Sequence, residues 1–451
     1  MDNKKDNFGS RLGFILAAAG SAVGLGNIWR FPYLAAKYGG GVFLIVYLIL
    51  ACTFGFALMI TEIALGRKTG KSVIGAYRAV NRHFSFLGPI AAIVPFIITP
   101  YYCVIGGWVL RYLTAFVTGN GTDAAGDGFF TNFIGQAGSP MIFFIIYAVL
   151  TALVVLLGVQ KGIEKISKLL MPLLVVLIIG IVIYTLTLPG AGEGIRYYLL
   201  PSIEGFTLST WLKTIMAAMG QLFYSMSLAM GIMVTYGSYM RKEDSIERSV
   251  RSIEIFDTGI AVLAGLIIVP SVFIFSNGDP NALNAGPSLM FVTLPKVFES
   301  MKGGQIIGAC FFVLVALAAL TSSISLLETM VSIISEKFKL KRIISTFIAL
   351  IFIFVFGSFS VFGYSIWDKV TIFGYQILDF FDFISNSVMM PIIAFITCIL
   401  IGYIAKTKYI EDEVLLGQKN FAAQKLYRIM VRYFCPACII IILLSPFIAD
   451  I

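Results

Sequence analysis

The sequence predicts an all-α integral membrane protein in which two spanning helices are interrupted near the middle of the bilayer. Three observations predict this fold class. The 451-residue chain is 59% hydrophobic and only 13% charged, with a mean hydropathy of +0.92, which excludes a soluble globular protein. Apolar stretches recur along it with the length of about 20 residues that a spanning helix needs. Two of these stretches carry small and polar residues at their centres.

Eleven apolar segments are long enough to span a membrane, and no soluble domain separates them. They cover residues 11–37, 41–66, 87–118, 141–159, 164–188, 211–239, 253–276, 304–335, 343–362, 370–404 and 427–449. The first and the sixth are the interrupted ones, which predicts two inverted repeats of five helices, 11–188 and 211–404. Segment 427–449 is then an additional eleventh helix within a single domain, 1–451.

The first segment contains the strongest local signal in the chain. Gly20, Gly24 and Gly26 fall within seven residues and are followed by Asn27 and Arg30. Each glycine weakens a helix interior by about 1 kcal/mol, and Asn and Arg are costly at membrane depth. A glycine face for close helix packing is one reading. The added polar residues favour a helix that unwinds and offers backbone carbonyls to an ion.

Oxygen-bearing side chains accompany both interruptions. Asn27 lies in the first segment, Ser225 in the sixth, Asp257 in the seventh, and the run 321–323 (Thr-Ser-Ser) in the eighth. Carbonyl, hydroxyl and carboxylate oxygens suit a hard cation, whereas Ser and Thr in membrane helices also bond their own backbone. Together with two broken helices, these residues predict a cation site.

Several acids lie inside the apolar segments, where an ionisable residue is a functional hypothesis by default. They include the buried acid Glu62, as well as Asp257, Glu328 and Asp379. Arg30, at the outer end of the first segment, needs an acidic partner, and we expect Asp379 to supply it.

The net charge of +9 follows from topology and does not indicate nucleic acid. Most Lys and Arg fall in alternate connecting segments, which predicts a cytoplasmic N-terminus and, after eleven spans, an extracellular C-terminus. His83 is the only histidine, so a histidine metal site and a histidine-dependent enzyme are excluded. The expected surroundings are the lipid bilayer of the cell membrane, and no obligate protein partner is inferred.

Motifs along nearly the whole chain resemble those of the bacterial neurotransmitter:sodium symporters, which have the leucine-transporter (LeuT-type) fold. The resemblance is carried by Arg11-Leu-Gly13, residues 20–32, Gly39-Gly-Gly41, residues 62–67, Pro100-Tyr-Tyr102, Lys161-Gly-Ile-Glu164, residues 220–225 and Leu320-Thr-Ser-Ser323. It implies an eleven-helix member of that family, with a 5+5 inverted repeat and broken helices 1 and 6.

The resemblance also implies two sodium sites. The first would use Ala22, Asn27, Ser225 and Asp257, completed by the carboxylate of the substrate. The second would use the carbonyls of Gly20, Val23 and Ala318 with the hydroxyls of Thr321 and Ser322. A ligand supplied by the substrate makes ion binding and substrate binding mutually dependent.

Substrate and gate positions carry over in the same way. The substrate would contact Ala22, Gly24, Leu25, Gly26, Ile98, Tyr102, Phe223, Tyr224, Ser225, Ser227, Met230, Ser322 and Leu326. The outer gate would pair Arg30 with Asp379, and the inner gate would pair Lys5 with Glu336.

Two positions refine the expected function. Asp257 stands where the family usually has Asn, and a fixed carboxylate there predicts transport that does not require chloride. Gly24 stands where amine-transporting relatives have Asp, which leaves room for a substrate carboxylate. With an uncharged aromatic pocket, the chain is expected to transport neutral, hydrophobic or aromatic L-amino acids by sodium symport and alternating access.

Two alternatives stay open. One is a sodium symporter of a small or modified amino acid such as glycine, alanine or a betaine. The other is a transporter-like sensor or channel, although a channel needs a continuous polar pore and the polar residues here converge at mid-membrane.

Overall fold

The computed structural model describes residues 7–276 and 287–448, with side chains described as far as 444. The predicted fold class is confirmed, because these residues form helices and turns with two isolated β-bridges, Gly40–Pro201 and Ile372–Tyr375. Lys5 lies outside the described residues.

The first half of the chain follows the five predicted segments. Its helices are α1 Arg11–Ala22, η1 Gly26–Arg30, α2 Phe31–Lys37, α3 Gly41–Leu50, η2 Ala51–Gly55, α4 Phe56–Thr69, α5 Val73–Val80, η3 Arg82–Phe84, α6 Leu87–Val117, α7 Gly121–Ala125, α8 Phe129–Ile134, α9 Gly138–Leu156, η4 Val159–Glu164 and α10 Lys165–Leu186. The η elements are short 3₁₀ or π turns, and most of them continue a neighbouring α-helix.

The second half contains the remaining helices. They are α11 Ala191–Leu199, α12 Leu208–Ser225, α13 Ile232–Gly237, α14 Ile246–Phe275, η6 Leu289–Thr293, α15 Leu294–Ser300, α16 Gly304–Phe338, α17 Arg342–Gly363, α18 Ile377–Asp382, η7 Phe383–Met389, α19 Met390–Ile399, η8 Leu400–Ile404, α20 Lys408–Leu416, α21 Gln424–Ile429, η9 Met430–Phe434 and α22 Cys435–Ile448. The predicted tenth segment begins at Ile377 rather than 370, because residues 369–375 form turns closed by the Ile372–Tyr375 bridge.

Among the described residues, nine helical segments are long and apolar enough to span a bilayer, and the pair Arg11–Ala22 and Gly26–Lys37 forms a tenth, bent by 55°. The sixth predicted segment is present as α12 and α13, but this pair is not one of the ten. The count of eleven spans therefore stays a prediction.

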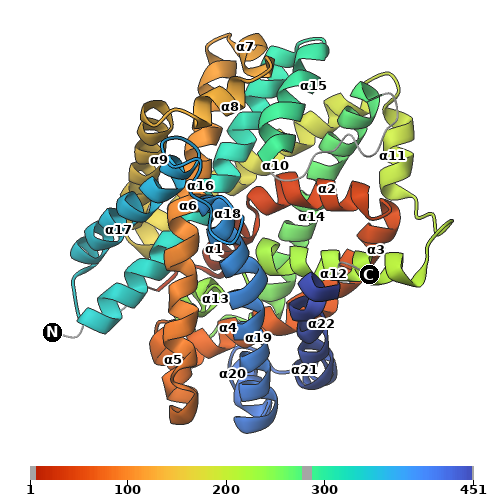
Figure 1. Ribbon diagram of the computed structural model, residues 1–451. Coiled ribbons are helices and arrows are strands. Elements are labelled where there is room, and N and C mark those ends of the chain that lie inside the picture. The colour runs from red at the N-terminus through yellow and green to blue at the C-terminus, as the bar shows by residue number, and fades with distance from the viewer. Residues whose placement is uncertain (1–6, 277–286, 449–451) are drawn as a thin grey trace.

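Figure 1 shows how these helices surround the two interruptions. The short helices α7, α8 and α15 lie at one end of the molecule, and α5, α20 and α21 lie at the opposite end. The long α16 packs against α6, α1 and α10. It therefore runs beside both the first interruption and the helices that enclose it.

The first interruption separates α1 from η1 at residues 23–25. Val23 is extended (φ −72°, ψ 99°), and its N–H still donates to the Ala19 carbonyl, which closes α1. The Asn27 side-chain oxygen accepts the Gly24 N–H at 3.0 Å. Helix then resumes through η1 and continues directly into α2, with Pro32 in the first turn of α2.

The second interruption separates α12 from α13 at residues 226–231. Ser227 (φ 52°), Ala229 (φ 59°) and Gly231 (φ 75°) all adopt left-handed backbone, and only glycine does so without cost. The predicted break in the sixth segment is therefore present, and it is conformationally more demanding than the first.

Candidate functional site

A buried polar cluster joins the first interruption to α12 and α14. The Asn27 amide nitrogen donates to Ser225 Oγ at 3.1 Å and to Asp257 Oδ1 at 2.8 Å. The Ser225 hydroxyl in turn donates to the same Oδ1 at 2.7 Å. Three of the four residues predicted for the first sodium site thus meet at one point, away from water. To bind a cation at this point, the Asn27 side chain would rotate so that its oxygen faces the ion instead of the Gly24 N–H.

Asp257 contributes a carboxyl group to this cluster. Its side chain is fully buried, and the Tyr47 hydroxyl lies 3.4 Å from Oδ2. No Lys or Arg makes an ion pair with Asp257 in the described part of the chain. A buried carboxylate without a cationic partner is costly, so its donor set fits a bound cation.

A second group of oxygens lies between α1 and α16. The Ser322 hydroxyl lies 3.4 Å from the Gly20 carbonyl, 3.1 Å from that of Ser21 and 3.3 Å from that of Val23. Thr321 Oγ1 lies 3.0 Å from the Ala318 carbonyl. Apart from Ser21, these are the residues predicted for the second sodium site, and α16 brings its members close to the end of α1.

A pocket lies between the two interruptions. The described residues that line it are Ser21, Ala22, Gly24, Leu25, Gly26, Ile98, Tyr102, Tyr224, Ser225, Ser227, Met230, Ile232, Ser322 and Leu326. None of these side chains is charged. The space left between them is about 20 Å³, roughly the room that one water needs, so the pocket is closed around its centre.

Residue 24 has to be glycine because the side chains of the pocket pack closely around it. A Cβ at this position would lie 2.7 Å from Ser322 Oγ and 3.1 Å from the Tyr102 hydroxyl. That hydroxyl also accepts the Leu25 N–H at 3.4 Å. A side chain larger than hydrogen at residue 24 would occupy the space where a ligand must enter.

Phe223 does not line the pocket, contrary to the sequence-based expectation. It packs edge-on against Phe54 at 5.3 Å and lines a separate cavity of about 760 Å³. Because α12 is still helical at this point, neighbouring side chains point in different directions. Sequence reasoning missed two pocket residues, Ser21 and Ile232; Ser21, polar and beside the break, carried a usable signal.

The acid opposite Arg30 is Asp382, and the expected pair with Asp379 is wrong. Asp379 accepts a hydrogen bond from the Tyr364 hydroxyl at 3.2 Å, and no Arg30–Asp379 ion pair occurs among the described residues. The charge of Arg30 acts on Asp382 instead. The two acids are one turn apart on α18, so helical spacing alone does not choose between them.

Arg30 and Tyr224 form the partition between the two cavities. The Arg30 guanidinium lies 5.6 Å from the centre of the Tyr224 ring, and Tyr224 lines both the closed pocket and the 760 Å³ cavity. Asp382 is held beside them by the Tyr101 hydroxyl at 3.1 Å.

At the other end of the molecule, Glu336 accepts a hydrogen bond from the Ser72 backbone N–H. Its expected partner Lys5 lies outside the described residues. A contact that the sequence did not reveal is made by Glu164, which accepts from the Gly9 N–H at 2.6 Å and from the Ser10 hydroxyl at 2.8 Å. The start of α1 is therefore tied to η4.

Glu62 supports the second interruption. Its Oε1 accepts the Ala229 N–H at 2.7 Å, and its side chain is 5% exposed. The buried acid predicted from the sequence thus accepts the N–H of Ala229, a residue with left-handed backbone in the second interruption.

Comparison with known proteins agrees with this geometry. The model of the sodium:neurotransmitter symporter family matches residues 5–123 and 129–450. A solved structure of MhsT in complex with L-phenylalanine superimposes with a TM-score of 0.87 at 36% identity, covering 98% of this chain and 99% of that one.

Curated relatives point the same way. A sodium-dependent transporter of Bacillus subtilis, YhdH, is 35% identical, and an uncharacterized sodium-dependent transporter of Haemophilus influenzae is 32% identical. Each alignment covers 98% of both chains. The chain therefore belongs to the sodium:neurotransmitter symporter family, and it is a multi-pass membrane transporter that uses sodium rather than an enzyme.

Proposed function

We propose that the protein takes up a neutral, hydrophobic or aromatic L-amino acid together with two sodium ions. The observation that carries the proposal is the closed, uncharged pocket between two helix breaks, flanked by two groups of oxygens. The structural neighbour was solved with L-phenylalanine bound, which supports an aromatic substrate.

The first ion would bind among Ala22, Asn27, Ser225 and Asp257, with the substrate carboxylate as a further ligand. The second would bind among the carbonyls of Gly20, Val23 and Ala318 and the hydroxyls of Thr321 and Ser322. The protein atoms in both sets are neutral oxygens apart from the Asp257 carboxylate, which is the donor set that a monovalent hard cation tolerates.

The substrate carboxylate would meet the backbone near Leu25 and Gly26 and the Tyr102 hydroxyl. The side chain of the substrate would lie against Ile98, Met230 and Leu326. The pocket has to expand from its closed form to admit such a ligand, and Met230 is the most adaptable wall because its side chain is unbranched.

Chloride should not be required. The buried Asp257 carboxylate, contacted by Ser225 and Tyr47, would supply the negative charge that balances sodium. Transport would proceed by alternating access, with Arg30, Asp382 and Tyr224 closing one side and Glu336 with Lys5 the other. The N-terminus would be cytoplasmic and the C-terminus extracellular.

The test is a thermal-shift measurement on the purified protein with a panel of L-amino acids, in sodium chloride, potassium chloride and sodium gluconate. We expect tryptophan, tyrosine, phenylalanine or leucine to raise the melting temperature in both sodium salts but not in potassium chloride.

The other outcomes separate the parts of the proposal. A shift with glycine or alanine alone would retain symport and contradict the bulky pocket. A shift that needs chloride would contradict the role of Asp257, and the absence of any sodium-dependent shift would contradict the assignment to amino acids.

A further inference from the structure

A long apolar groove opens on the outer surface of the helix bundle, away from the pocket. It has a volume of about 620 Å³ and is walled by α5, α6, α16, α17 and the side chain of Phe381 on α18. Of the described side chains that line it, Lys337 is the one that is not apolar. This volume is within the range of sites that hold a molecule of several hundred daltons.

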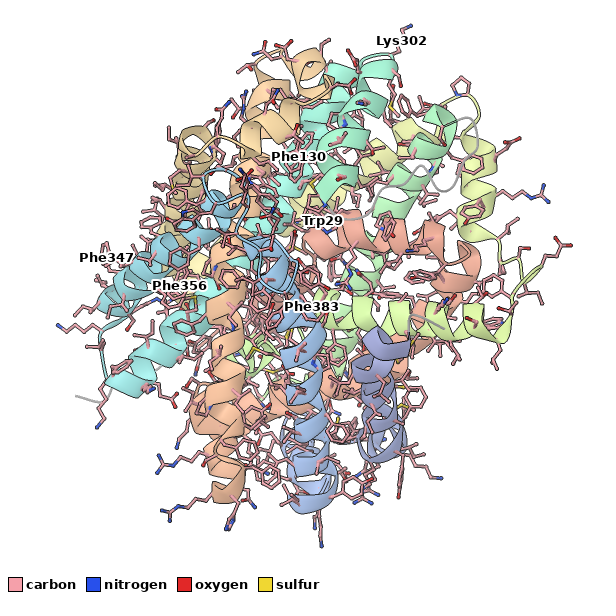
Figure 2. The ribbon with its side chains drawn as sticks, viewed as in Figure 1. Trp29, Phe130, Lys302, Phe347, Phe356 and Phe383 are labelled. Atoms are coloured by element: carbon pink, nitrogen blue, oxygen red, sulfur yellow. The ribbon has the colours of Figure 1, made fainter. Side chains whose placement is uncertain are left out.

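Aromatic rings form one wall of the groove. Phe352 stacks on Phe356 with ring centres 4.1 Å apart and meets Phe96 of α6 edge-on at 5.1 Å. Figure 2 shows Phe356 between the ribbons of α17 and α6, whereas Phe347 of the same helix points away at the outer edge. The groove is therefore a cleft between helices, with Phe347 outside it.

The groove runs along α6 and α17 for a length close to the thickness of one leaflet of a bilayer. On α17 the lining runs from Ile348 to Phe356, and on α6 from Pro89 to Ile97. Eight residues of helix rise about 12 Å, and half of the hydrocarbon core is about 15 Å thick. An acyl chain therefore fits along the groove.

The end of the groove at the C-terminus of α16 is basic. Lys337 ends the lining, and Lys339 and Lys341 follow in the connection from α16 to α17. Within the described residues, none of these three lysines is in an ion pair. The nearest carboxylates in sequence are already engaged, Glu328 with Arg342 and Glu336 with the Ser72 N–H.

We propose that this groove binds one anionic phospholipid, with an acyl chain along α6 and α17 and the phosphate at Lys337, Lys339 and Lys341. A cluster of lysines at the end of spanning helices attracts anionic headgroups, and the apolar walls take the chain. The groove shares no lining residue with the pocket, so lipid binding there is independent of the proposed substrate.

The experiment is native mass spectrometry of the full-length purified protein with added dioleoyl phosphatidylglycerol or dioleoyl phosphatidylcholine. We expect one phosphatidylglycerol to stay bound at a concentration about tenfold below that needed for phosphatidylcholine. The triple variant K337Q/K339Q/K341Q should reduce this preference to less than about threefold.

Two matched controls test the place of binding. The variant K408Q/K419Q/K425Q removes the same charge from a different connection and should keep the preference. Ile93→Trp fills the groove from an exposed lining position and should reduce binding of both lipids, whereas Phe347→Trp, at a position outside the groove, should not.

Equal binding of the two lipids by the unmodified protein would overturn the proposal. So would an unchanged preference in the groove triple variant, or equal effects of the two triple variants. A lipid-free dimer that Ile93→Trp dissociates would also overturn it, because the groove would then be an interface between two copies of the chain.

Discussion

The two helix interruptions differ in their backbone angles and in the contacts that stabilise them. The first, at residues 23–25, keeps ordinary backbone angles, and Ser322 of α16 contacts the Val23 carbonyl and two carbonyls in the last turn of α1. The second, at residues 226–231, is longer and places Ser227 and Ala229 in left-handed backbone. Its Ala229 N–H donates to the buried Glu62 carboxyl group. The first break is thus built for fixed geometry, and the second stores strain that a change of conformation can release.

The largest expected effect comes from removing the support of the second break. Glu62→Ala leaves the buried Ala229 N–H without its acceptor and should lower the free energy of unfolding by about 2–3 kcal/mol. Glu62→Gln keeps an acceptor oxygen and should lose less than about 1 kcal/mol. Thermal unfolding in detergent measures both, and equal losses would show that the hydrogen bond to Ala229 does not stabilise the break.

At the first break, loss of one hydroxyl should act on sodium rather than on the fold. Ser322→Ala should raise the sodium concentration for half-maximal uptake by about tenfold, which corresponds to about 1.4 kcal/mol. Its neighbour Ser323 is the matched control, because its hydroxyl faces Tyr147 and Thr151 instead. If Ser323→Ala raises the sodium concentration for half-maximal uptake as strongly, the Ser322 hydroxyl at the first break is not a specific sodium ligand.

The buried negative charge next to the first break should be replaceable by a chloride ion from solution. Asp257→Asn removes the buried carboxylate while keeping the side-chain size. Uptake by this variant should then depend on chloride, falling by about fivefold when gluconate replaces it, whereas the unmodified protein should be indifferent. Chloride-independent uptake by Asp257→Asn would mean that Asp257 does not balance the ion.

The smallest effect measures the strain itself. Ala229→Gly removes a Cβ from left-handed backbone and should stabilise the protein by about 0.5–1 kcal/mol. Ala22→Gly is the matched change at the first break, where Ala22 ends an ordinary α-helix, and it should destabilise by a similar amount. Equal signs for the two changes would remove the distinction between the breaks.

The sequence predicted the breaks because glycine, asparagine and serine inside apolar segments have an energetic cost that only unwinding or close packing explains. It identified Glu62 for the same reason, since a buried acid requires a partner. It selected Asp379 instead of Asp382 as the partner of Arg30, because both acids lie on one face of α18 and only the position of Arg30 in the fold distinguishes them. Whether Phe223 and Ser21 line the pocket depends on the residue at which each helix ends. An uncertainty of one residue there changes the direction of a side chain by about 100°.

The 55° bend of the first span also fixes the direction of two helix dipoles. The carbonyl end of α1 carries about half a negative charge, and the N–H end of the following helix carries about half a positive charge. Because only residues 23–25 separate them, both partial charges face the same small volume. A continuous helix would have neutralised these ends within its own hydrogen bonds. The bend therefore creates a dipolar surface that favours a cation and an anionic group bound side by side over either one bound alone.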